Sequence, residues 1–192
     1  GWAGQLLERA LGATAGSRAA PDFESIGVEM KSLPVDRSGT PLESTYVCTV
    51  KLTGNTNTQW EQSWPCKKLS RVLWVPILCE RSIPIPERVI GTPFLWSPSE
   101  AESRILQQDW EYLRGLILEG EVERIKGSMG EALHIRPKAA KASDKAWAMG
   151  EEGEWVQVNP RGFYLRSRFT HGIIRSHLAL PATNSPSPAR DS

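Results

Sequence analysis

Segments of helical and strand periodicity alternate along this chain, and the alternation limits its fold more than any other feature. Apolar residues in 2–11 repeat with the period of a helix, whereas residues 26–33 alternate between apolar and charged side chains, as a strand does. Further strands are expected at residues 45–52, 72–78, 133–136 and 154–158, and further helices from residue 97 and over residues 167–180. This order predicts the α/β class.

Two of the expected helices carry boundary signals. Gly12 is placed to end the first helix, and Ser97, Pro98 and Glu100 have the composition of a capping-box start for the second. The second helix then continues with one apolar stripe: Leu106, Trp110, Leu113 and Ile117. Residues 55–68 show little periodicity and are predicted to form a long loop, a kind of segment that often carries function.

The size of the chain predicts one domain. Its 192 residues, of which 40% are hydrophobic, are enough for one substantial core, which we expect within residues 1–180. Residues 181–192 are rich in Pro, Ser and Ala and are expected to be disordered. The three cysteines show no disulfide or zinc-site spacing, and no apolar run is long enough to span a membrane, so we expect a reduced, cytoplasmic protein.

The net charge of +1 neither requires nor excludes a nucleic-acid partner, but the charge is unevenly distributed. Residues 100–126 carry seven acidic and four basic side chains, whereas residues 135–175 carry eight Lys or Arg and four acidic side chains. Phosphate contacts are therefore expected in the second segment and in loops, and the acidic helix is expected to face away from DNA.

Asp22, Glu29 and Lys31 form the strongest candidate for a catalytic site. Residues i and i+2 of a strand share one face and lie ~7 Å apart, so Glu29 and Lys31 project together, and Asp22 can return from the preceding turn. Carboxylates bind Mg²⁺, and Met30 offers a backbone carbonyl as a further ligand. Lys31 would hold or deprotonate the water that attacks a phosphodiester. On these residues alone, a solvated strand face with a salt-bridged lysine is the more common interpretation.

The wider sequence resembles the MutH family of the PD-(D/E)XK nuclease superfamily. The resemblance extends from residue 1 to about residue 178 and consists of several separate motifs in the expected order. They are GWAGQLLE at 1–8, LGATAGS at 11–17, DF at 22–23, GVEMK at 27–31, PLE at 41–43, LTG at 52–54, KL at 68–69, VLW at 72–74, IRPKAA at 135–140 and PRGFYL at 160–165.

The resemblance implies a fold and a catalytic set. The fold is restriction-endonuclease-like, a mixed sheet flanked by helices, in two lobes around a DNA cleft. Asp22, Glu29 and Lys31 would form the catalytic motif, Glu8 would complete an acidic site for Mg²⁺, with Mn²⁺ as an alternative ion, and Lys68 would lie near the active site and the DNA. Without the family, Glu8 would be an ordinary exposed helix residue and Lys68 a surface lysine.

The resemblance also implies the residues that read DNA. Arg136, Pro137 and Lys138 match the loop that enters the major groove, where arginine can bond guanine bidentately. Tyr164 matches the tyrosine beside the N6 edge of adenine, and Arg161 lies in the same motif. Without the family, Arg136–Lys138 would be a charged strand end and Tyr164 a core aromatic. Residues 64–67 depart from the family's usual stretch, so contacts just before Lys68 are open.

The activity implied by the resemblance is a Mg²⁺-dependent nick in the unmethylated strand at hemimethylated GATC sites in mismatch repair. The family acts as a monomer that is stimulated by MutL after MutS has found a mismatch. A restriction enzyme that cuts both GATC strands remains an alternative, and so does a DNA-binding module whose nuclease site has decayed. The intact Asp22, Glu29 and Lys31 argue against decay.

Overall fold

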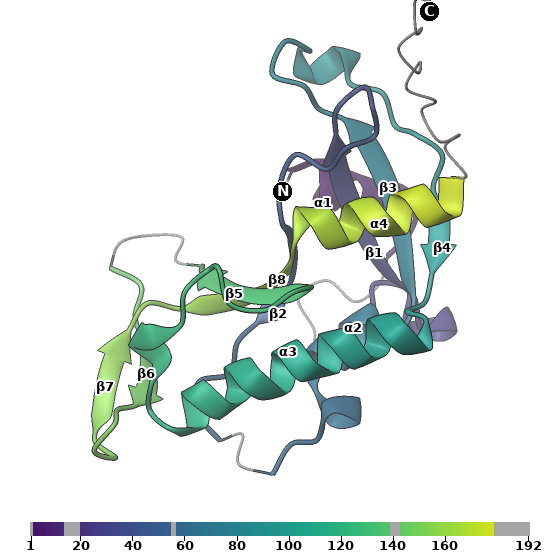
Figure 1. Ribbon diagram of the computed structural model, residues 1–192. Helices are drawn as coiled ribbons and strands as arrows, with labels where there is room; N and C mark the ends of the chain where they lie inside the picture. Colours follow the sequence, from purple (N-terminus) through teal and green to yellow (C-terminus); the bar gives the residue numbers. More distant parts are fainter. Residues whose placement is uncertain (1, 14–19, 55–56, 139–142, 179–192) are drawn as a thin grey trace, which may run out of the picture.

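The computed structural model describes residues 2–13, 20–54, 57–138 and 143–178. The helices are α1 (Trp2–Ala10), α2 (Trp64–Leu69), α3 (Glu100–Leu118) and α4 (Ser167–Leu178). The strands are β1 (Glu29–Val35), β2 (Thr45–Thr49), β3 (Val72–Leu78), β4 (Phe94–Trp96), β5 (Leu133–Pro137), β6 (Ala146–Met149), β7 (Trp155–Val158) and β8 (Arg161–Leu165). In Figure 1, α1, α4 and the β1–β3–β4 strands form one lobe, and α3 with β2, β5 and β8 forms the other. The α/β class with two lobes is confirmed.

The first lobe is built on a small mixed sheet in the order β1-β3-β4. Strand β1 runs parallel to β3 along its whole length, and β4 is antiparallel to β3. Most of β1 is buried on both of its faces, so Glu29 and Lys31 do not lie on a solvated strand face. The alternative interpretation of the motif, which required such a face, is therefore wrong. The strand also starts later than its alternation predicted, because Ile26 belongs to a 3-10 turn (Glu24–Ile26) and is exposed.

The second lobe contains an antiparallel sheet in the order β2-β8-β5, with α3 packed below it. The predicted apolar stripe of α3 is confirmed: Leu106, Trp110, Leu113 and Ile117 are all buried. The capping box is confirmed in kind, but it is formed by Ser99 and Glu102, two residues beyond Ser97. One contiguous cluster of buried hydrophobic residues contains side chains from both lobes, so the lobes share a core.

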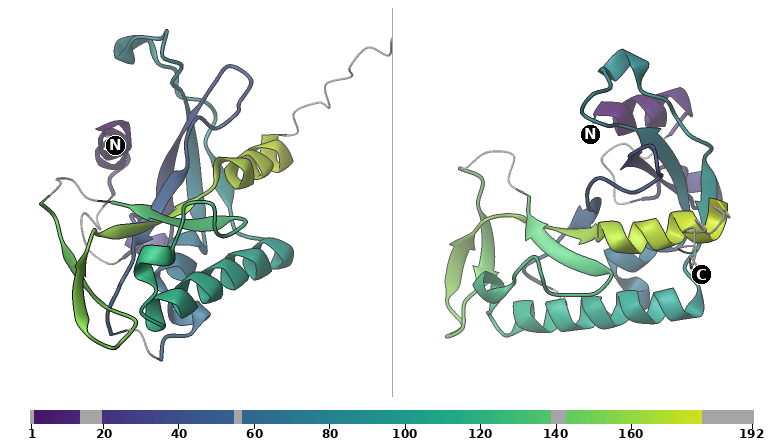
Figure 2. Two further views of the ribbon diagram at one scale, coloured as in Figure 1. Left: turned by 60° about the vertical axis from the view of Figure 1, so that its left-hand side comes forward. Right: turned by 45° about the horizontal axis from the view of Figure 1, so that its top comes forward.

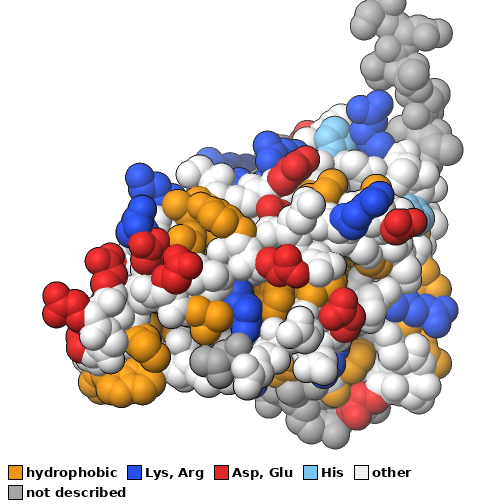
Figure 3. Space-filling view, turned by 60° about the horizontal axis from the view of Figure 1, so that its bottom comes forward, with side chains coloured by type: hydrophobic (Ala, Val, Ile, Leu, Met, Phe, Trp, Pro, Cys, Tyr) orange, Lys and Arg blue, Asp and Glu red, His pale blue; other side chains and the backbone are white. Residues whose placement is uncertain are grey.

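Strands β6 and β7 form a separate hairpin at one end of the second lobe (Figure 1). Strand β6 was not expected from the sequence, and neither were β4 and β8. Trp147, Met149 and Trp155 are exposed on this hairpin, and hydrophobic side chains gather at that end of the molecule in Figure 3. In the described residues the strands form three sheets, and the expected mixed sheet is β1-β3-β4.

Helices α1 and α4 border the first lobe, and Figure 2 shows α1 at its side, near β1. Gly12, with φ of 76°, follows α1 as predicted. Helix α4 matches the expected closing helix, while the predicted tail at 181–192 lies outside the described residues. In the described part of the chain, no helix is both long enough and apolar enough to cross a membrane.

The predicted loop is only partly present. Residues 57–68 contain a 3-10 turn (Trp60–Gln62) and most of α2. Ser63 caps α2 by accepting a hydrogen bond from the Cys66 amide, and Pro65 stands in the first turn, where its missing N–H has no cost. Six residues are too few for a visible apolar period, which is why the pattern did not predict this helix.

Asp109 fastens α3 to β5, and its replacement tests how the second lobe is held together. Its buried carboxylate accepts hydrogen bonds from the amides of Glu131, Ala132 and Leu133, at 2.8, 2.6 and 2.8 Å. Asp109→Ala leaves these donors without their acceptor and should lower the free energy of unfolding by at least about 3 kcal/mol in urea denaturation. Glu111→Ala, on the same helix but exposed, should have almost no effect. Equal stabilities would contradict this role.

Candidate active site and DNA-reading surface

Glu29 is the centre of the candidate active site. Its side chain is almost fully buried, and each carboxylate oxygen meets one lysine: Oε1 lies 3.1 Å from Lys31 Nζ, and Oε2 lies 2.8 Å from Lys68 Nζ. A buried carboxylate is tolerated when its charge is compensated in this way. The structure therefore brings together three of the residues that the sequence selected.

Asp22 reaches the same place from the turn before β1. Its Oδ2 accepts a hydrogen bond of 2.9 Å from the amide of Met30, which holds the carboxylate beside the strand. Asp22 is only 8% exposed, so its position is set by the fold and not by solvent. The predicted return of Asp22 towards Glu29 and Lys31 is thus present, with Met30 between them.

Lys68 is placed by α2. Its ammonium group donates to Glu29 Oε2 and also to the carbonyl oxygen of Ala20, at 2.8 Å in each case. These two bonds tie α2 to the segment before Asp22 and to the start of β1. Lys68 is therefore a half-buried part of the site and not a free surface lysine.

Glu8 lies across the same cavity, on α1. The cavity, of about 380 Å³, is lined by Glu8, Asp22, Glu29, Lys31 and Lys68 among others. Burial raises the pKa of the Glu8 carboxyl, and the negative charges of Asp22 and Glu29 raise it further. Three carboxylates that repel one another around one cavity are stabilised by a cation.

The chemistry of these donors fits Mg²⁺, which prefers carboxylate and carbonyl oxygens. In the described residues, no three His, Cys, Asp or Glu side chains stand close enough to enclose an ion as they are. Both oxygens of Glu29 are bonded to lysines, so Glu29 would have to release at least one ammonium group to bind a metal ion. The residues therefore offer the ligand atoms that Mg²⁺ prefers, but Glu29 must exchange a lysine contact for the metal ion before it can bind.

A group of aromatic and basic side chains lies on the sheet of the second lobe, next to the acidic cavity. Tyr46 of β2 and Tyr164 of β8 are register partners, with ring centroids 5.3 Å apart. The guanidinium of Arg136 stands 5.8 Å from the Tyr164 ring centroid, and Lys138 Nζ lies 3.3 Å from that of Tyr46. Each pair is a cation–π contact.

The acidic and aromatic groups border a continuous hollow between the two lobes. A second cavity of about 500 Å³ is lined by Glu8 and Lys31 from the first lobe and by Arg136 and Tyr164 from the second. Tyr46 lines both cavities. The candidate catalytic residues and most of the candidate DNA-reading residues thus face the same space.

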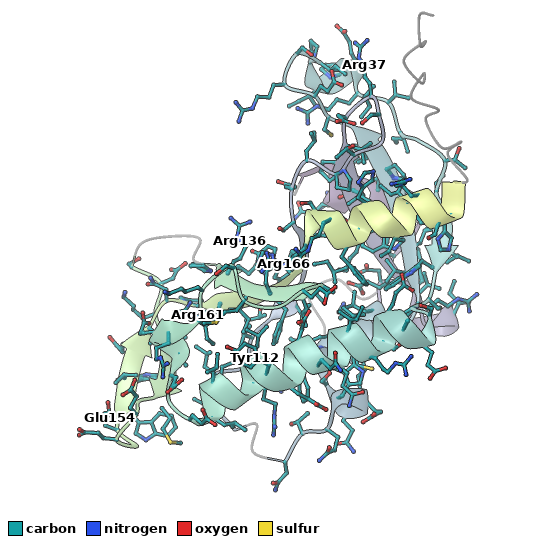
Figure 4. All side chains as sticks on the ribbon, viewed as in Figure 1. Arg37, Tyr112, Arg136, Glu154, Arg161 and Arg166 are labelled. Carbon is teal, nitrogen blue, oxygen red and sulfur yellow. The ribbon has the colours of Figure 1, made fainter. Side chains whose placement is uncertain are left out.

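Arg161 does not belong to this surface, contrary to its expected place among the DNA-reading residues. Successive strand residues point to opposite faces, so Arg161 shares the core face with Phe163 and Leu165, while Tyr164 faces the cleft. Arg161 is buried and its Nη2 lies 3.3 Å from Glu123 Oε1. Figure 4 shows Arg136 and Arg161 on different sides of the sheet. Pro137 is exposed at the end of β5 and lines neither cavity.

Tyr46 was not among the residues predicted from the sequence, yet it lines both cavities. Gly162 explains how closely the two tyrosines approach, because a Cβ atom there would lie 3.0 Å from a ring carbon of each. Strand alternation placed Tyr46 on one face of a predicted strand, but only its pairing with β8 brings it opposite Tyr164. The available signal was an aromatic residue in the predicted strand at 45–52 together with the tyrosine of the motif at 160–165.

Comparison with known proteins identifies a family. The family model described as MutH, DNA mismatch repair enzyme MutH, matches residues 11–109. The DNA mismatch repair protein MutH of Shigella flexneri serotype 5b is 51% identical over 180 residues, which is 94% of this chain and 79% of that protein. The proteins of the same description from Escherichia coli O6:K15:H31 and Salmonella newport are 50% and 52% identical, again over 94% of this chain and over 79% and 78% of their own lengths.

His134 lies beside Tyr164, as its register partner in β5, and makes stability depend on pH. Its buried ring packs edge-on to Tyr164, with Nδ1 2.9 Å from the carbonyl oxygen of Gly127 and Nε2 3.2 Å from Ser44 Oγ. Burial, which prevails over the bond to Gly127, lowers the pKa of His134 below its usual range. An unfolded chain therefore takes up this proton first as the pH falls.

The free energy of unfolding should thus decrease as the pH is lowered from about 7.5 through about 6.5, the ordinary histidine pKa, and continue to decrease until the folded pKa is passed. Urea denaturation across this range measures the effect. His134→Gln should lose this component while His171 and His177 remain as internal controls. An unchanged pH dependence in the variant would contradict the assignment to His134.

Proposed function

Because this chain belongs to the MutH family of DNA mismatch-repair endonucleases, we propose that it uses Mg²⁺ to nick the unmethylated strand of hemimethylated GATC sites. Family membership makes the chain an endodeoxyribonuclease of mismatch repair. The observation that carries the finer proposal is that Glu8, Asp22, Glu29 and Lys31 line one cavity, which continues to the Arg136 and Tyr164 side chains.

Asp22, Glu29 and Glu8 would hold the magnesium ion, together with the carbonyl oxygen of Met30. Such an ion supplies positive charge for the developing phosphoryl charge and lowers the pKa of a water molecule. Burial and, after it, the negative charges of Asp22 and Glu29 raise the pKa of Glu8, and the second cause supports its part because a cation would neutralise that charge. Mn²⁺ takes the same oxygen ligands and would serve as an alternative ion.

Lys31 and Lys68 would divide the remaining work. Lys31 lies within hydrogen-bond distance of Glu29 and would orient the attacking water or accept its proton. The bond from the water oxygen to phosphorus then forms as the bond to one bridging oxygen breaks, and that oxygen takes up a proton. Lys68, once released from Glu29, would meet a phosphate oxygen of the DNA.

Arg136 and Tyr164 would read the site. Arg136 is exposed at the end of β5 and supported by the Tyr164 ring, so its planar donors are free to meet O6 and N7 of guanine. Tyr164, packed between Tyr46 and His134, would lie beside the N6 edge of adenine and sense an added methyl group there. Lys138, held over Tyr46, would contact the backbone phosphates.

One set of catalytic residues per chain supports nicking by a monomer over cutting of both strands, which requires a second catalytic centre. Activation by MutL, after MutS has found a mismatch, would act on the two lobes that border the cleft. A shift from open to closed lobes would bring the Lys31 side and the Tyr164 side onto the DNA together.

Strand-resolved cleavage tests the proposed reaction. A duplex with a single GATC, labelled on both strands and unmethylated, hemimethylated or fully methylated, is incubated with Mg²⁺, with and without MutL. We expect nicks on the unmethylated strand only, faster with MutL, and a loss of at least about 10²-fold in Lys31→Ala, the usual size of a proton-transfer contribution. Arg175→Ala, in the last turn of α4, is the matched control for a lost cation. Double-strand cuts would instead identify a restriction enzyme, and binding without cleavage a decayed site.

The metal role of Glu8 makes a separate prediction. Glu8→Gln keeps the size of the side chain but removes one of the carboxylates that line the cavity. The Mg²⁺ concentration for half-maximal nicking should rise by about tenfold or more. A loss of ~1.4 kcal/mol of binding free energy raises the dissociation constant tenfold. Glu61→Gln, exposed and outside the cavity, should leave the concentration unchanged. Identical Mg²⁺ curves for both variants would remove Glu8 from the metal site.

A further inference from the structure

A third cavity, of about 220 Å³, lies behind the catalytic one. It is enclosed by the end of β2, by the segment that includes α2, and by α3. Thr49 and Trp64 line both this cavity and the catalytic cavity, so the two cavities adjoin at these residues. Neither the catalytic residues nor the DNA-reading residues named above line it.

The lining of this cavity is cationic. Lys51, Lys67 and Arg114 contribute to it from three separate segments, and no acidic side chain of the described residues lines it. Like charges gathered around one hollow raise its positive potential and stabilise a bound anion. Helix α3 was expected to be acidic and to face away from phosphate, but Arg114 lies on its inner side, one turn beyond Trp110.

The cavity is also aromatic. The guanidinium carbon of Arg114 stands 5.3 Å from the Trp110 ring centroid, and Lys51 Nζ stands 5.8 Å from that of Trp64. A guanidinium held against a flat ring can present its in-plane N–H groups to a phosphate. The Trp64 ring offers a surface on which another flat ring can stack. Gln62 adds an amide that can donate and accept hydrogen bonds.

We propose that this cavity binds a nucleoside phosphate, with the phosphate at Arg114 and Lys67 and the base against Trp64. Positive charge alone would accept any anion, and an aromatic lining alone would accept any flat apolar group. The combination selects a ligand that carries both. The ligand is either a free nucleotide or a nucleotide unit of a DNA strand that passes the catalytic cavity. This assignment does not depend on the proposed cleavage reaction.

Titration of the full chain with deoxyadenosine monophosphate, without divalent metal and at low salt, tests the proposal. The indole N–H signals of Trp64 and Trp110 are followed by nuclear magnetic resonance. We expect both signals to shift, with saturation in the range of about 1 mM or below, which corresponds to a few favourable contacts. Deoxyadenosine and inorganic phosphate should each cause much smaller shifts, since each lacks one half of the ligand. Equal shifts with phosphate alone would overturn the nucleoside assignment.

Variants locate the binding. Lys67→Gln with Arg114→Gln removes two positive charges from the lining and should weaken the nucleotide by roughly tenfold or more, because charged hydrogen bonds to phosphate are strong. Arg114→Lys retains the charge and should bind better than Arg114→Gln. The matched control is Lys126→Gln with Arg175→Gln, which removes two exposed cations elsewhere. Equal weakening in the control pair, or no weakening in the cavity pair, would overturn the proposal; thermal denaturation of each variant verifies that it is folded.

A competition experiment distinguishes the two sources of the ligand. Lys31→Ala, which is expected to bind but not cut, is saturated with duplex DNA and then titrated with the nucleotide. If the duplex prevents the shifts of Trp64 and Trp110, the cavity holds a nucleotide unit of the DNA strand. If the shifts persist, the cavity holds a free nucleotide. Both outcomes support the proposal. DNA cleavage by the cavity variants is measured separately, so that a failure of the nucleotide-binding proposal can be distinguished from a failure of the proposed cleavage reaction.

Discussion

The buried carboxylate of Glu29, shared by two lysine ammonium groups, is the interaction on which the catalytic end of the molecule depends. Lys31 reaches it from the same strand and Lys68 from α2, so the contact fixes strand and helix relative to each other. Removing one partner of a buried ion pair typically costs about 3–5 kcal/mol. The same contacts hold two ammonium groups at the place proposed for a divalent cation and a phosphate, so the residues that stabilise this part of the fold are also those proposed for the chemistry.

In the second lobe, strand alternation decides which side chains of β8 face the core and which face the hollow between the lobes. In β8, Phe163 and Leu165 fill the core, and Tyr164 is therefore obliged to face the hollow between the lobes. Gly162, on the face of Tyr164, leaves room for two tyrosine rings side by side. A shift of one residue in the β8 register would bury Tyr164 and turn the core residues outward. Core packing thus also decides which side chains face the hollow between the lobes.

Elements with a long, clear period could be predicted, and short or paired elements could not. The stripe of α3 and the whole of β3 were visible because each contains enough residues to repeat a pattern. Helix α2 is too short for that, and β4 and β8 are recognisable mainly by the strands that they pair with. Arg161 shows the limit for single residues: its motif suggested DNA contact, but its strand face assigns it to Glu123 and the core.

The amino-acid order was enough to select Glu8, Asp22, Glu29, Lys31 and Lys68, to predict an α/β protein, and to indicate the MutH family, because residue type, local spacing and motif order are properties of the chain itself. Distances across the molecule are not. Burial of Glu29 between two lysines, the pairing of Tyr46 with Tyr164, and the cationic cavity behind Trp64 each join segments far apart in sequence. They follow from the packing of the two lobes on one core, where a side chain's neighbours are set by the fold and not by its place in the chain.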